Sequence, residues 1–178
     1  VDSYLSDIDS SMSDFEKAVI LHDKIVLNCE YDLTTANCGN IYGALVEGKV
    51  KCSGYSEVYS YLLSQVGIDS ELIISDSMNH MWNKICLDGI WYNVDVTFDD
   101  PLMNGYDDAG YVRHDFFLLS DYAISDMPDA SDNHTDFDDA YYRCVSTKYD
   151  SSILPEINTR LCLIDGSFYM IDNTYKSS

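Results

Sequence analysis

Three residues of this chain have types that could together perform nucleophilic chemistry: Cys52, His80 and Asp95. A cysteine can attack a carbonyl carbon, a histidine can act as its base, and an aspartate can orient the imidazole. Apolar residues at helical spacing predict a helix from about Ser53 to Val66, ended by Gly67, so that Cys52 lies at its first turn. Free N–H groups and the helix dipole favour an anion there, so we expect a thiol with a lowered pKa and raised reactivity.

A β-hairpin is expected to bring the histidine and the aspartate together. The pair Asp88-Gly89 stands between two strand-like runs, which is a strong signal for a two-residue turn. With that loop, His80 lies opposite Thr97 and Trp82 lies opposite Asp95, all on one face of the sheet. His80 and Asp95 are then diagonal neighbours, with backbones roughly 7–8 Å apart, so the carboxylate can reach the imidazole.

The motifs around these residues resemble those of the bacterial transglutaminase-like superfamily, whose core is shared with papain-type cysteine peptidases. They are C-x-G-Y from Cys52, N-H-x-W-N around His80, and W-Y-x-V-D-x-T-x-D-D-P around Asp95. The resemblance covers about residues 14–120 and implies Cys52 as nucleophile, His80 as base and Asp95 as orienter. Ser53 stands where animal-type transglutaminases have tryptophan, and Phe98 stands where the family often has tryptophan. These departures weaken the expectation of cross-linking activity more than that of the fold.

Two aromatic residues are candidates for the surroundings of the nucleophile. The resemblance implies that Tyr42 lies near the active site, where it could donate to an oxyanion, although a packing role is as well supported. Trp82 shares the face of His80 and could form a wall of the cleft, or it is a core aromatic. The backbone N–H of Cys52 is the safer oxyanion donor, because an amide at a helix start has no helical partner.

The other three histidines have separate expectations. His22 lies on the apolar face of a predicted helix over residues 15–29 and is expected to be a packed, hydrogen-bonded core residue. His114 is the main rival to His80 as the base. His134 lies in the polar, acidic segment 121–139, which is typical of a long loop or lid, and is expected to be exposed.

Neither a metal nor a cofactor is expected. No C-x-x-C pair is present, and the acidic residues near position 100 lack the order of an EF-hand, so a solvated loop is favoured over a calcium site. These acidic residues are Asp99, Asp100, Asp107 and Asp108. Of the 6 cysteines, Cys29 and Cys38 form the most plausible disulfide and Cys144 with Cys162 a weaker one, while a fully reduced chain is about as well supported.

Composition limits the classes of partner. The chain has 178 residues with 46% hydrophobic residues, and its 31 acidic and 10 basic residues give a net charge of −21. Such a charge argues against nucleic acid and against anionic lipid surfaces. No run of eighteen apolar residues occurs, so membrane insertion is not expected. The acid excess favours solubility outside a cell, which predicts an extracellular or cell-surface protein whose targeting signal is not visible in this sequence.

The element pattern predicts one α+β domain over residues 1–178. Ser13 or Asp14 is expected to cap the first long helix. Core motifs at about 14–121 precede the acidic loop 121–139 and C-terminal strands at 141–171. Strands are expected at 72–75, at 116–119 within the stretch 113–120, and at 141–148, and a second Asp-Gly hairpin is expected at 160–171. The fold class is therefore a papain-like or transglutaminase-like core, with N-terminal helices and the Cys52 helix packed on an antiparallel sheet.

Three functions are compatible with these residues. The first is a cysteine-dependent amide hydrolase, a peptidase or amidase, that passes through a thioester. The second is a transglutaminase-type acyl transferase, which uses the same residues but lets an amine attack the thioester. The third is a non-catalytic cell-surface binding module. The expected partner is a protein or peptide substrate, with a cell-wall peptide as one candidate, and the sequence does not specify the oligomeric state.

Overall fold

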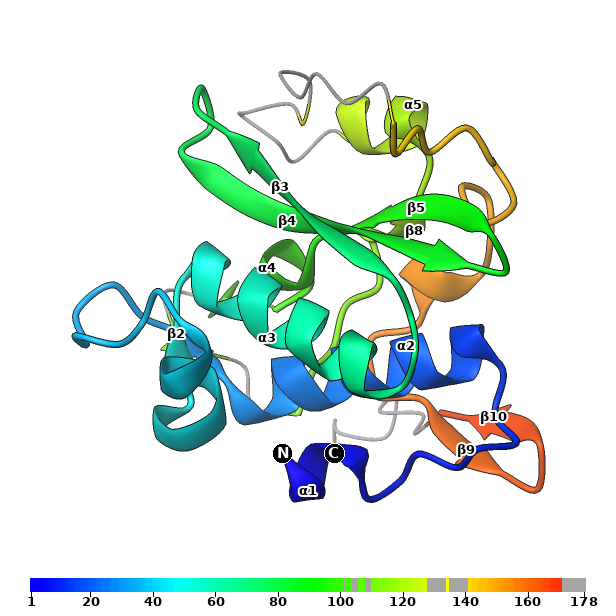
Figure 1. Ribbon diagram of the computed structural model, residues 1–178, viewed down its shortest axis with the longest axis horizontal. Helices are drawn as coiled ribbons and strands as arrows, with labels where there is room; N and C mark the ends of the chain where they lie inside the picture. Colours follow the sequence, from blue (N-terminus) through cyan, green and yellow to red (C-terminus); the bar gives the residue numbers. More distant parts are fainter. Residues whose placement is uncertain (101, 104–105, 108–109, 128–133, 135–140, 171–178) are drawn as a thin grey trace, which may run out of the picture.

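A four-stranded antiparallel sheet lies against the helix that begins at Cys52 in the computed structural model of the chain (Figure 1). The structure describes residues 1–100, 102–103, 106–107, 110–127, 134 and 141–170. The strands follow the order β3-β4-β5-β8. Their bounds are Ser70–Ser75 for β3, His80–Leu87 for β4, Ile90–Val94 for β5 and Phe117–Leu119 for β8. The predicted α+β class with an antiparallel sheet is confirmed.

The β4–β5 hairpin has the predicted register as far as Val94. Leu87 pairs with Ile90 and Asn83 with Val94. The turn residues Asp88 and Gly89 have φ angles of 52° and 79°, as a turn with two left-handed residues requires. These pairs confirm the two-residue loop that the sequence predicted.

The strand predicted to run on to Thr97 ends earlier. β5 stops at Val94, and the short helix α4 (Val96–Asp99) follows. The side chain of Asp95 caps this helix, because it accepts hydrogen bonds from the backbone N–H groups of Thr97 and Phe98. An aspartate at a helix N-cap satisfies amides that have no helical partner, so the chain turns away from the sheet at Asp95.

Two long helices carry the core. α2 (Asp14–Asn28) begins with a capping box between Ser13 and Glu16, as the sequence signal indicated. α3 (Cys52–Gln65) agrees with its predicted bounds to within one residue, and Gly67 has a φ of 81°, in the left-handed region. The fully buried side chains between α2, α3 and the sheet include Leu21, Ile25, Tyr59, Leu62 and Ile85.

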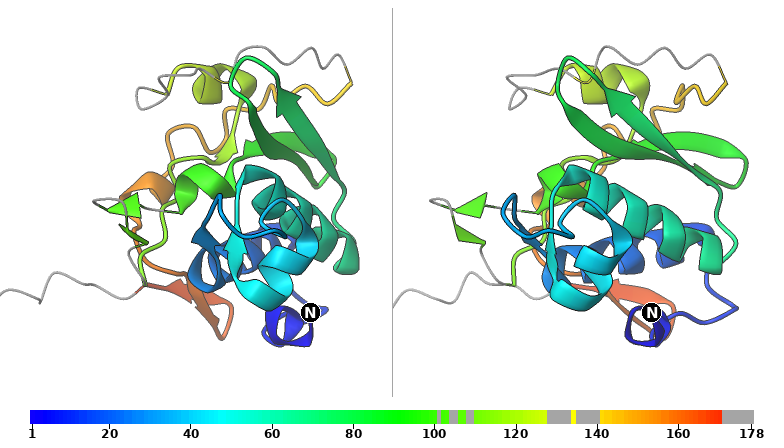
Figure 2. Two further views of the ribbon diagram at one scale, coloured as in Figure 1. Left: turned by 90° about the vertical axis from the view of Figure 1, so that its left-hand side faces the viewer. Right: turned by 60° about the vertical axis from the view of Figure 1, so that its left-hand side comes forward.

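Figure 2 shows the layers, with the sheet on one side of α3 and α2 on the other. A second, smaller apolar cluster contains Ile73, Trp82, Phe116, Leu119 and Ile124. Ile124 belongs to α5 (Asp121–Ser125), which contacts β5 and β8. The start of α3, where Cys52 stands, and the start of β4, where His80 stands, therefore lie between the main core and this smaller cluster.

The remaining elements are short. They are α1 (Asp2–Leu5), β1 (Glu30–Tyr31) paired in parallel with β2 (Lys49–Val50), the π-helix η1 (Gly43–Glu47), β6 (Leu102–Met103) paired with β7 (Tyr106–Asp107), the 3-10 helix η2 (Leu154–Glu156), and β9 (Cys162–Ile164) paired with β10 (Ser167–Tyr169). The β9–β10 pair confirms the second predicted hairpin, and its turn residues Asp165 and Gly166 have φ angles of 51° and 73°.

Two expectations for the second half of the chain are wrong. The acidic stretch expected to be a loop from residue 121 begins with the helix α5. The segment 141–148 is not a strand. Backbone groups of Cys144 in this segment form their hydrogen bonds with Asp121 instead of with a neighbouring strand. Cys144 donates its N–H to the carboxylate of Asp121 at 3.1 Å and accepts from the N–H of Asp121 at 2.8 Å. Most of the predicted loop beyond α5, and the predicted strand end at residue 171, lie outside the described residues.

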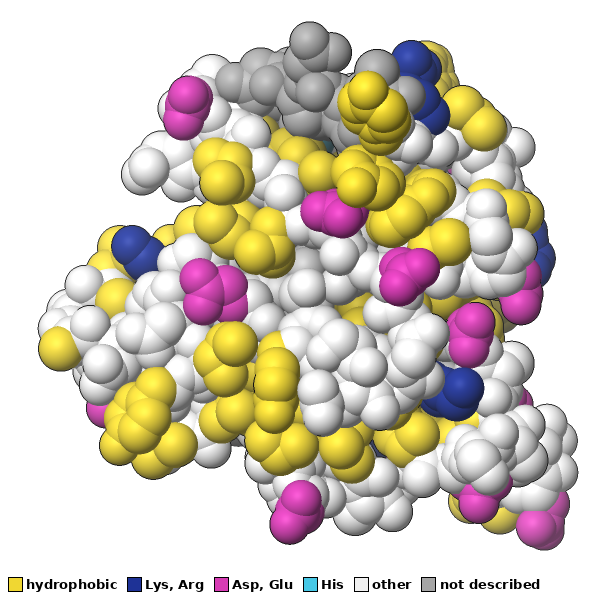
Figure 3. All heavy atoms as spheres, viewed as in Figure 1, with side chains coloured by type: hydrophobic (Ala, Val, Ile, Leu, Met, Phe, Trp, Pro, Cys, Tyr) yellow, Lys and Arg dark blue, Asp and Glu magenta, His cyan; other side chains and the backbone are white. Residues whose placement is uncertain are grey.

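The surface, the helices and the cysteines each bear on an expectation from the sequence. Acidic side chains are scattered singly over the face shown in Figure 3. Among the described helices, none combines the length and the apolar character that crossing a bilayer requires. All six cysteines are free thiols, so the predicted Cys29–Cys38 and Cys144–Cys162 bridges are not formed.

Candidate active site

The start of α3 fixes the position of the Cys52 thiol. The preceding residue, Lys51, donates its N–H to the carbonyl of Cys38 at 2.8 Å. Gly54 lets this loop approach, because a Cβ at that position would stand 2.6 Å from the Cys38 oxygen and 2.7 Å from a methyl group of Val50. The small residue in the C-x-G-Y motif therefore has a packing reason, and it keeps Cys52 at the first residue of the helix.

His80 and Asp95 are in direct contact. His80 is the first residue of β4 and pairs with Ser75 of β3. Its Nε2 lies 2.6 Å from Oδ2 of Asp95. Asp95 is fully buried, and its Oδ1 accepts from the N–H groups of Thr97 at 3.1 Å and Phe98 at 3.2 Å. The contact predicted from the hairpin spacing is confirmed, although it is made from a helix cap rather than from a strand.

The other side of the His80 ring faces the thiol. Cys52 and His80 line the same cleft, and each shifts the pKa of the other. Because Nε2 of His80 is bonded to Asp95, Nδ1 is the ring nitrogen left for the sulfur. The backbone N–H groups of Met81 and Ser53 also point at the Cys52 sulfur. Charge-assisted donors of this kind favour a thiolate over a thiol.

The protonation states follow from these contacts. Burial acts to raise the pKa of Cys52, but the hydrogen bond and charge of His80 and the backbone donors lower it below the ordinary value of a thiol. Burial acts to lower the pKa of His80, but the charge of Asp95 and the hydrogen bonds to Asp95 and Cys52 raise it to about 10. Both shifts favour the thiolate–imidazolium form of the pair over the neutral form.

Asp95 stays ionised despite its burial. Burial acts to raise the pKa of this carboxyl, but the charge of His80 and hydrogen bonds from His134 and His80 lower it to about 2. A carboxylate in this state can only accept hydrogen bonds. It therefore fixes the proton of His80 on Nε2 and turns Nδ1 toward Cys52.

A cleft of about 260 Å³ opens beside the thiol. It lies between the start of α3 and the turn that joins β3 to β4 (Figure 1). Its lining includes Cys52 and His80 together with the apolar side chains of Leu33 and Ile74, which are 66% and 61% exposed. A carbonyl group that entered this cleft would meet the sulfur and the imidazole together.

The two aromatic candidates have different outcomes. Trp82 is fully buried, its ring stacks on that of His80 with centroids 6.1 Å apart, and its Nε1 donates to Asn93 Oδ1. It supports the imidazole from behind and does not line the cleft. Tyr42 is 55% exposed and is not among the residues that line the cleft, whereas Tyr31 is. The structure therefore does not bring Tyr42 to the thiol.

His134 was expected to be exposed, and this expectation is wrong. Its side chain is fully buried, and its Nε2 lies 2.9 Å from Oδ2 of Asp95. Nothing in the local sequence marks this contact, because His134 is separated from Asp95 by 39 positions and stands in a polar, acidic stretch. Only the tertiary structure identifies it as a neighbour of Asp95.

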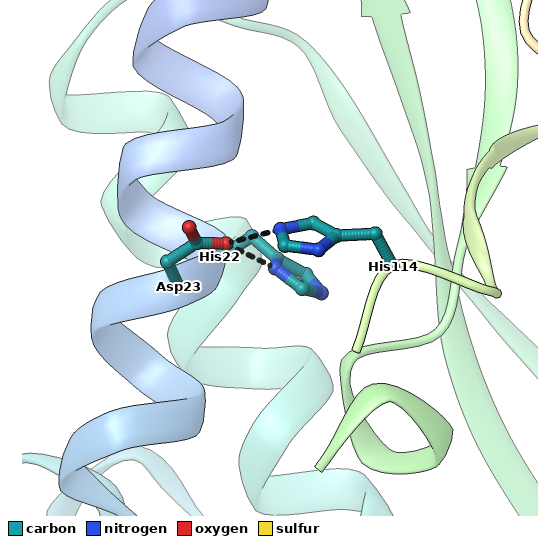
Figure 4. Close-up of side chains that lie close together, drawn as sticks. All are labelled: His22, Asp23 and His114. Carbon is teal, nitrogen blue, oxygen red and sulfur yellow. Dashed lines mark hydrogen bonds and ion pairs between the residues drawn. The ribbon is translucent and has the colours of Figure 1, made fainter. Parts of the chain in front are cut away.

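His114, the alternative to His80 as the base, belongs to a second buried cluster, which is shown in Figure 4 with His22 and Asp23. His114 Nε2 and His22 Nδ1 both lie 2.9 Å from Oδ1 of Asp23. His22 Nε2 lies 3.1 Å from Asp99, and His114 Nδ1 lies 2.9 Å from the carbonyl of Ile157. Each ring nitrogen has an acceptor, so the cluster is satisfied as a hydrogen-bonded network. His114 is therefore a structural residue, and the prediction of a hydrogen-bonded core role for His22 is confirmed.

This network also corrects the expectation of a solvated acidic loop. Asp99 is fully buried and Asp100 is 6% exposed. Asp99 accepts from the N–H of Phe116 at 2.9 Å, and Asp100 bonds the hydroxyl of Tyr55 on α3. The side chains of Asp107 and Asp108 lie outside what the structure describes. Asp99 and Asp100 therefore anchor the end of α4, whose other end is capped by Asp95.

Comparison with known proteins gives a family match. The family model of the transglutaminase-like superfamily matches residues 2–96, just over half of the chain. A search of curated proteins finds no significant match.

Two solved structures are similar over part of the chain. The crystal structure of a TGase has 16% identity and a TM-score of 0.43, covering 49% of this chain and 27% of that chain. A putative cysteine protease from Cytophaga hutchinsonii has 18% identity and a TM-score of 0.44, covering 60% of this chain and 38% of that chain. The chain therefore spans well under half the length of both structures.

Proposed function

Because the chain belongs to the transglutaminase-like superfamily, we propose that it is a cysteine-dependent amide hydrolase, a peptidase or amidase. The observation that carries the proposal is that Cys52 and His80 line one cleft while Nε2 of His80 is bonded to the buried Asp95. A nucleophile, a base and an orienting group in contact form the arrangement that acyl transfer needs.

The first half of the reaction forms a thioester. The Cys52 thiolate attacks the amide carbon, and the electron pair of the C=O bond moves to oxygen. When the tetrahedral intermediate collapses, the C–N bond breaks, and the amine leaves with the proton that His80 held on Nδ1. Because the pKa of the Cys52 thiol is lowered, removing the proton from sulfur costs less than for an ordinary cysteine.

The second half regenerates the thiolate. His80, now neutral at Nδ1, takes a proton from water, and the oxygen attacks the thioester carbon. The C–S bond breaks and leaves a carboxylic acid and the thiolate–imidazolium pair. In both halves the backbone N–H of Cys52 is the proposed oxyanion donor, because the first amides of a helix have no helical acceptor.

The proposed substrate is a protein or peptide. The cleft is open on one side and has apolar side chains, Leu33 and Ile74, beside the thiol. Besides Cys52 and His80, its lining includes the basic Lys51 and the acidic Asp76. This mixture suits an extended peptide segment better than a nucleotide or another strongly anionic ligand.

The test uses casein and a set of cell-wall stem peptides. New amino termini report hydrolysis of peptide bonds, and released ammonia reports acylation of the thiol by a side-chain amide. A dansyl-labelled alkyl amine in the same reaction reports transfer to an amine. We expect hydrolysis that is abolished in Cys52→Ala and retained in the control Cys86→Ala, since Cys86 lies on β4 and is not among the cleft residues. Predominant incorporation of the labelled amine would instead support a transferase. Absence of both reactions, with an unreactive Cys52, would support a binding module.

A further inference from the structure

Asp95 receives hydrogen bonds from two imidazole rings on the same oxygen. Its Oδ2 lies 2.6 Å from Nε2 of His80 and 2.9 Å from Nε2 of His134. Because the ionised carboxylate can only accept, both nitrogens carry a proton and donate. With Oδ1 bonded to the amides of Thr97 and Phe98, the carboxylate has four donors and no acceptor direction left for water.

An aromatic enclosure fixes the ring of His134. The ring centroid of Trp82 is 4.8 Å away with the planes at 83°, that of Phe98 is 5.4 Å away, and that of Phe116 is 5.7 Å away. The rings of Trp82 and Phe98 meet that of His134 edge-to-face, which is favourable at these separations. The side chain of His134 is fully buried among these rings, so its orientation toward Asp95 is defined by packing as well as by the hydrogen bond.

The other ring nitrogen indicates why a histidine stands there. Nδ1 of His134 is buried and has no hydrogen-bond partner among the described residues. Leaving a buried polar atom unpaired costs about 1–3 kcal/mol. A phenylalanine would fill the same enclosure without that cost. What the histidine adds is the Nε2–H donor to Asp95.

We propose that His134 is a positioning residue of the triad: its Nε2–H holds the Oδ2 oxygen of Asp95 in place and keeps this carboxylate ionised opposite His80. The proposal deepens the proposed function, since it concerns the same thiolate–imidazolium pair. His134 does not touch the sulfur and acts through Asp95.

Removing the donor has a defined consequence. A buried carboxylate that loses a hydrogen bond to its charged form becomes more basic. Asp95 then takes a larger share of the proton on Nε2 of His80, and the imidazolium opposite Cys52 is weakened. Less thiolate is present at neutral pH, so the thiol reacts more slowly.

The test compares His134→Phe with His134→Gln. Phenylalanine keeps the ring volume and removes the donor, whereas glutamine restores an N–H donor at about the position of Nε2. We measure the rate of Cys52 alkylation by iodoacetamide from pH 5 to 9, which needs no substrate, together with the melting temperature. We expect about a three- to thirty-fold slower reaction at pH 7 for His134→Phe, less than the full strength of a charged hydrogen bond, and a rate within about threefold of the wild type for His134→Gln.

Two results would overturn the proposal. One is a wild-type rate for His134→Phe at every pH. The other is an equal loss in both variants. A measurement on the wild type covers the case in which His134→Phe does not fold: ¹⁵N NMR should find the proton of His134 on Nε2, and a proton on Nδ1 alone would contradict the hydrogen bond to Asp95. Because alkylation is independent of turnover, a positive result with no amide hydrolysis would refute the proposed function and leave the positioning role intact.

Discussion

The carboxylate of Asp95 is at once the partner of His80 and a helix cap. Its Oδ2 accepts from His80 and its Oδ1 accepts from the amides of Thr97 and Phe98. The geometry of the imidazole therefore depends on the start of α4. A change at Asp95 affects both the protonation of the site and the local backbone.

Asp95→Asn should lower turnover strongly. An asparagine amide keeps almost the same volume but can present an NH₂ group to the N–H donors of His80 and His134, which forces a different tautomer. We expect a loss of about ten- to a thousand-fold in kcat, or about 1.4–4 kcal/mol of barrier. Steady-state kinetics on any amide substrate, with circular dichroism as the control for folding, measures this. Full activity in Asp95→Ala would show that another group orients His80.

His22 should make the stability of the protein depend on pH. Burial acts to lower its pKa, but hydrogen bonds to Asp23 and Asp99 raise it to about 9 from an ordinary value of 6.5. Because the pKa of His22 is higher in the folded protein than in the unfolded chain, protonated His22 stabilises the fold. This stabilisation is complete below about pH 6.5 and is lost as the pH rises through 9. Urea unfolding of the wild type and of His22→Gln should therefore show a difference in unfolding free energy that shrinks from pH 6.5 to 9.

The comparison with His22→Gln is needed because His80 titrates in an overlapping range, with a pKa of about 10. The effect of His80 is present in both proteins and cancels in the difference. A difference in unfolding free energy that stays constant from pH 6.5 to 9 would show that His22 does not exchange a proton on unfolding in this range.

At the scale of elements, α3 and α4 hold the site between them. α3 carries Cys52 at its first residue, and α4 is capped by Asp95 at one end and anchored by Asp99 at the other. The hydroxyl of Tyr55 on α3 bonds Asp100, at the end of α4. The elements that carry Cys52 and Asp95 are therefore linked through a second contact that does not pass through His80.

Gly54→Ala should disturb the start of α3. The new methyl group would stand 2.6 Å from the Cys38 oxygen and 2.7 Å from Val50, closer than packed atoms allow. We expect a loss of about 1–3 kcal/mol of unfolding free energy together with slower alkylation of Cys52. Urea unfolding measures the first. Gln65→Ala, an exposed change at the other end of α3, is the control and should alter neither value. A fully stable Gly54→Ala would mean that the loop at Cys38 moves freely.

Local elements could be predicted from the sequence. The capping box at Ser13, the left-handed Gly67 and the Asp88-Gly89 turn each act within a few residues, so their signals lie side by side in the chain. The turn also sets the pairing register of the two strands, and this register predicted the proximity of His80 and Asp95. The prediction failed at Val96, where a side-chain cap competed with the continuation of the strand.

At the scale of the whole molecule, the sequence did not predict long-range contacts. His134 reaches Asp95 and His114 reaches Asp23 across 39 and 91 positions, and no spacing rule connects such residues. The alternation at 141–148 suggested a strand, but a strand needs a partner, and Asp121 satisfies the backbone of Cys144 instead. The extracellular or cell-surface location inferred from the net charge of −21 stays a prediction.

The central claim is that Cys52 is an activated nucleophile, and a short pulse of iodoacetamide at neutral pH followed by mass spectrometry tests it most directly. The account predicts that Cys52 is the fastest-labelled of the six thiols in the folded protein, that His80→Ala slows its labelling by at least about tenfold, and that the six react alike in denaturant, since its advantage comes from its thiolate. Rapid labelling of Cys86 or Cys162 while Cys52 stays unmodified would contradict it.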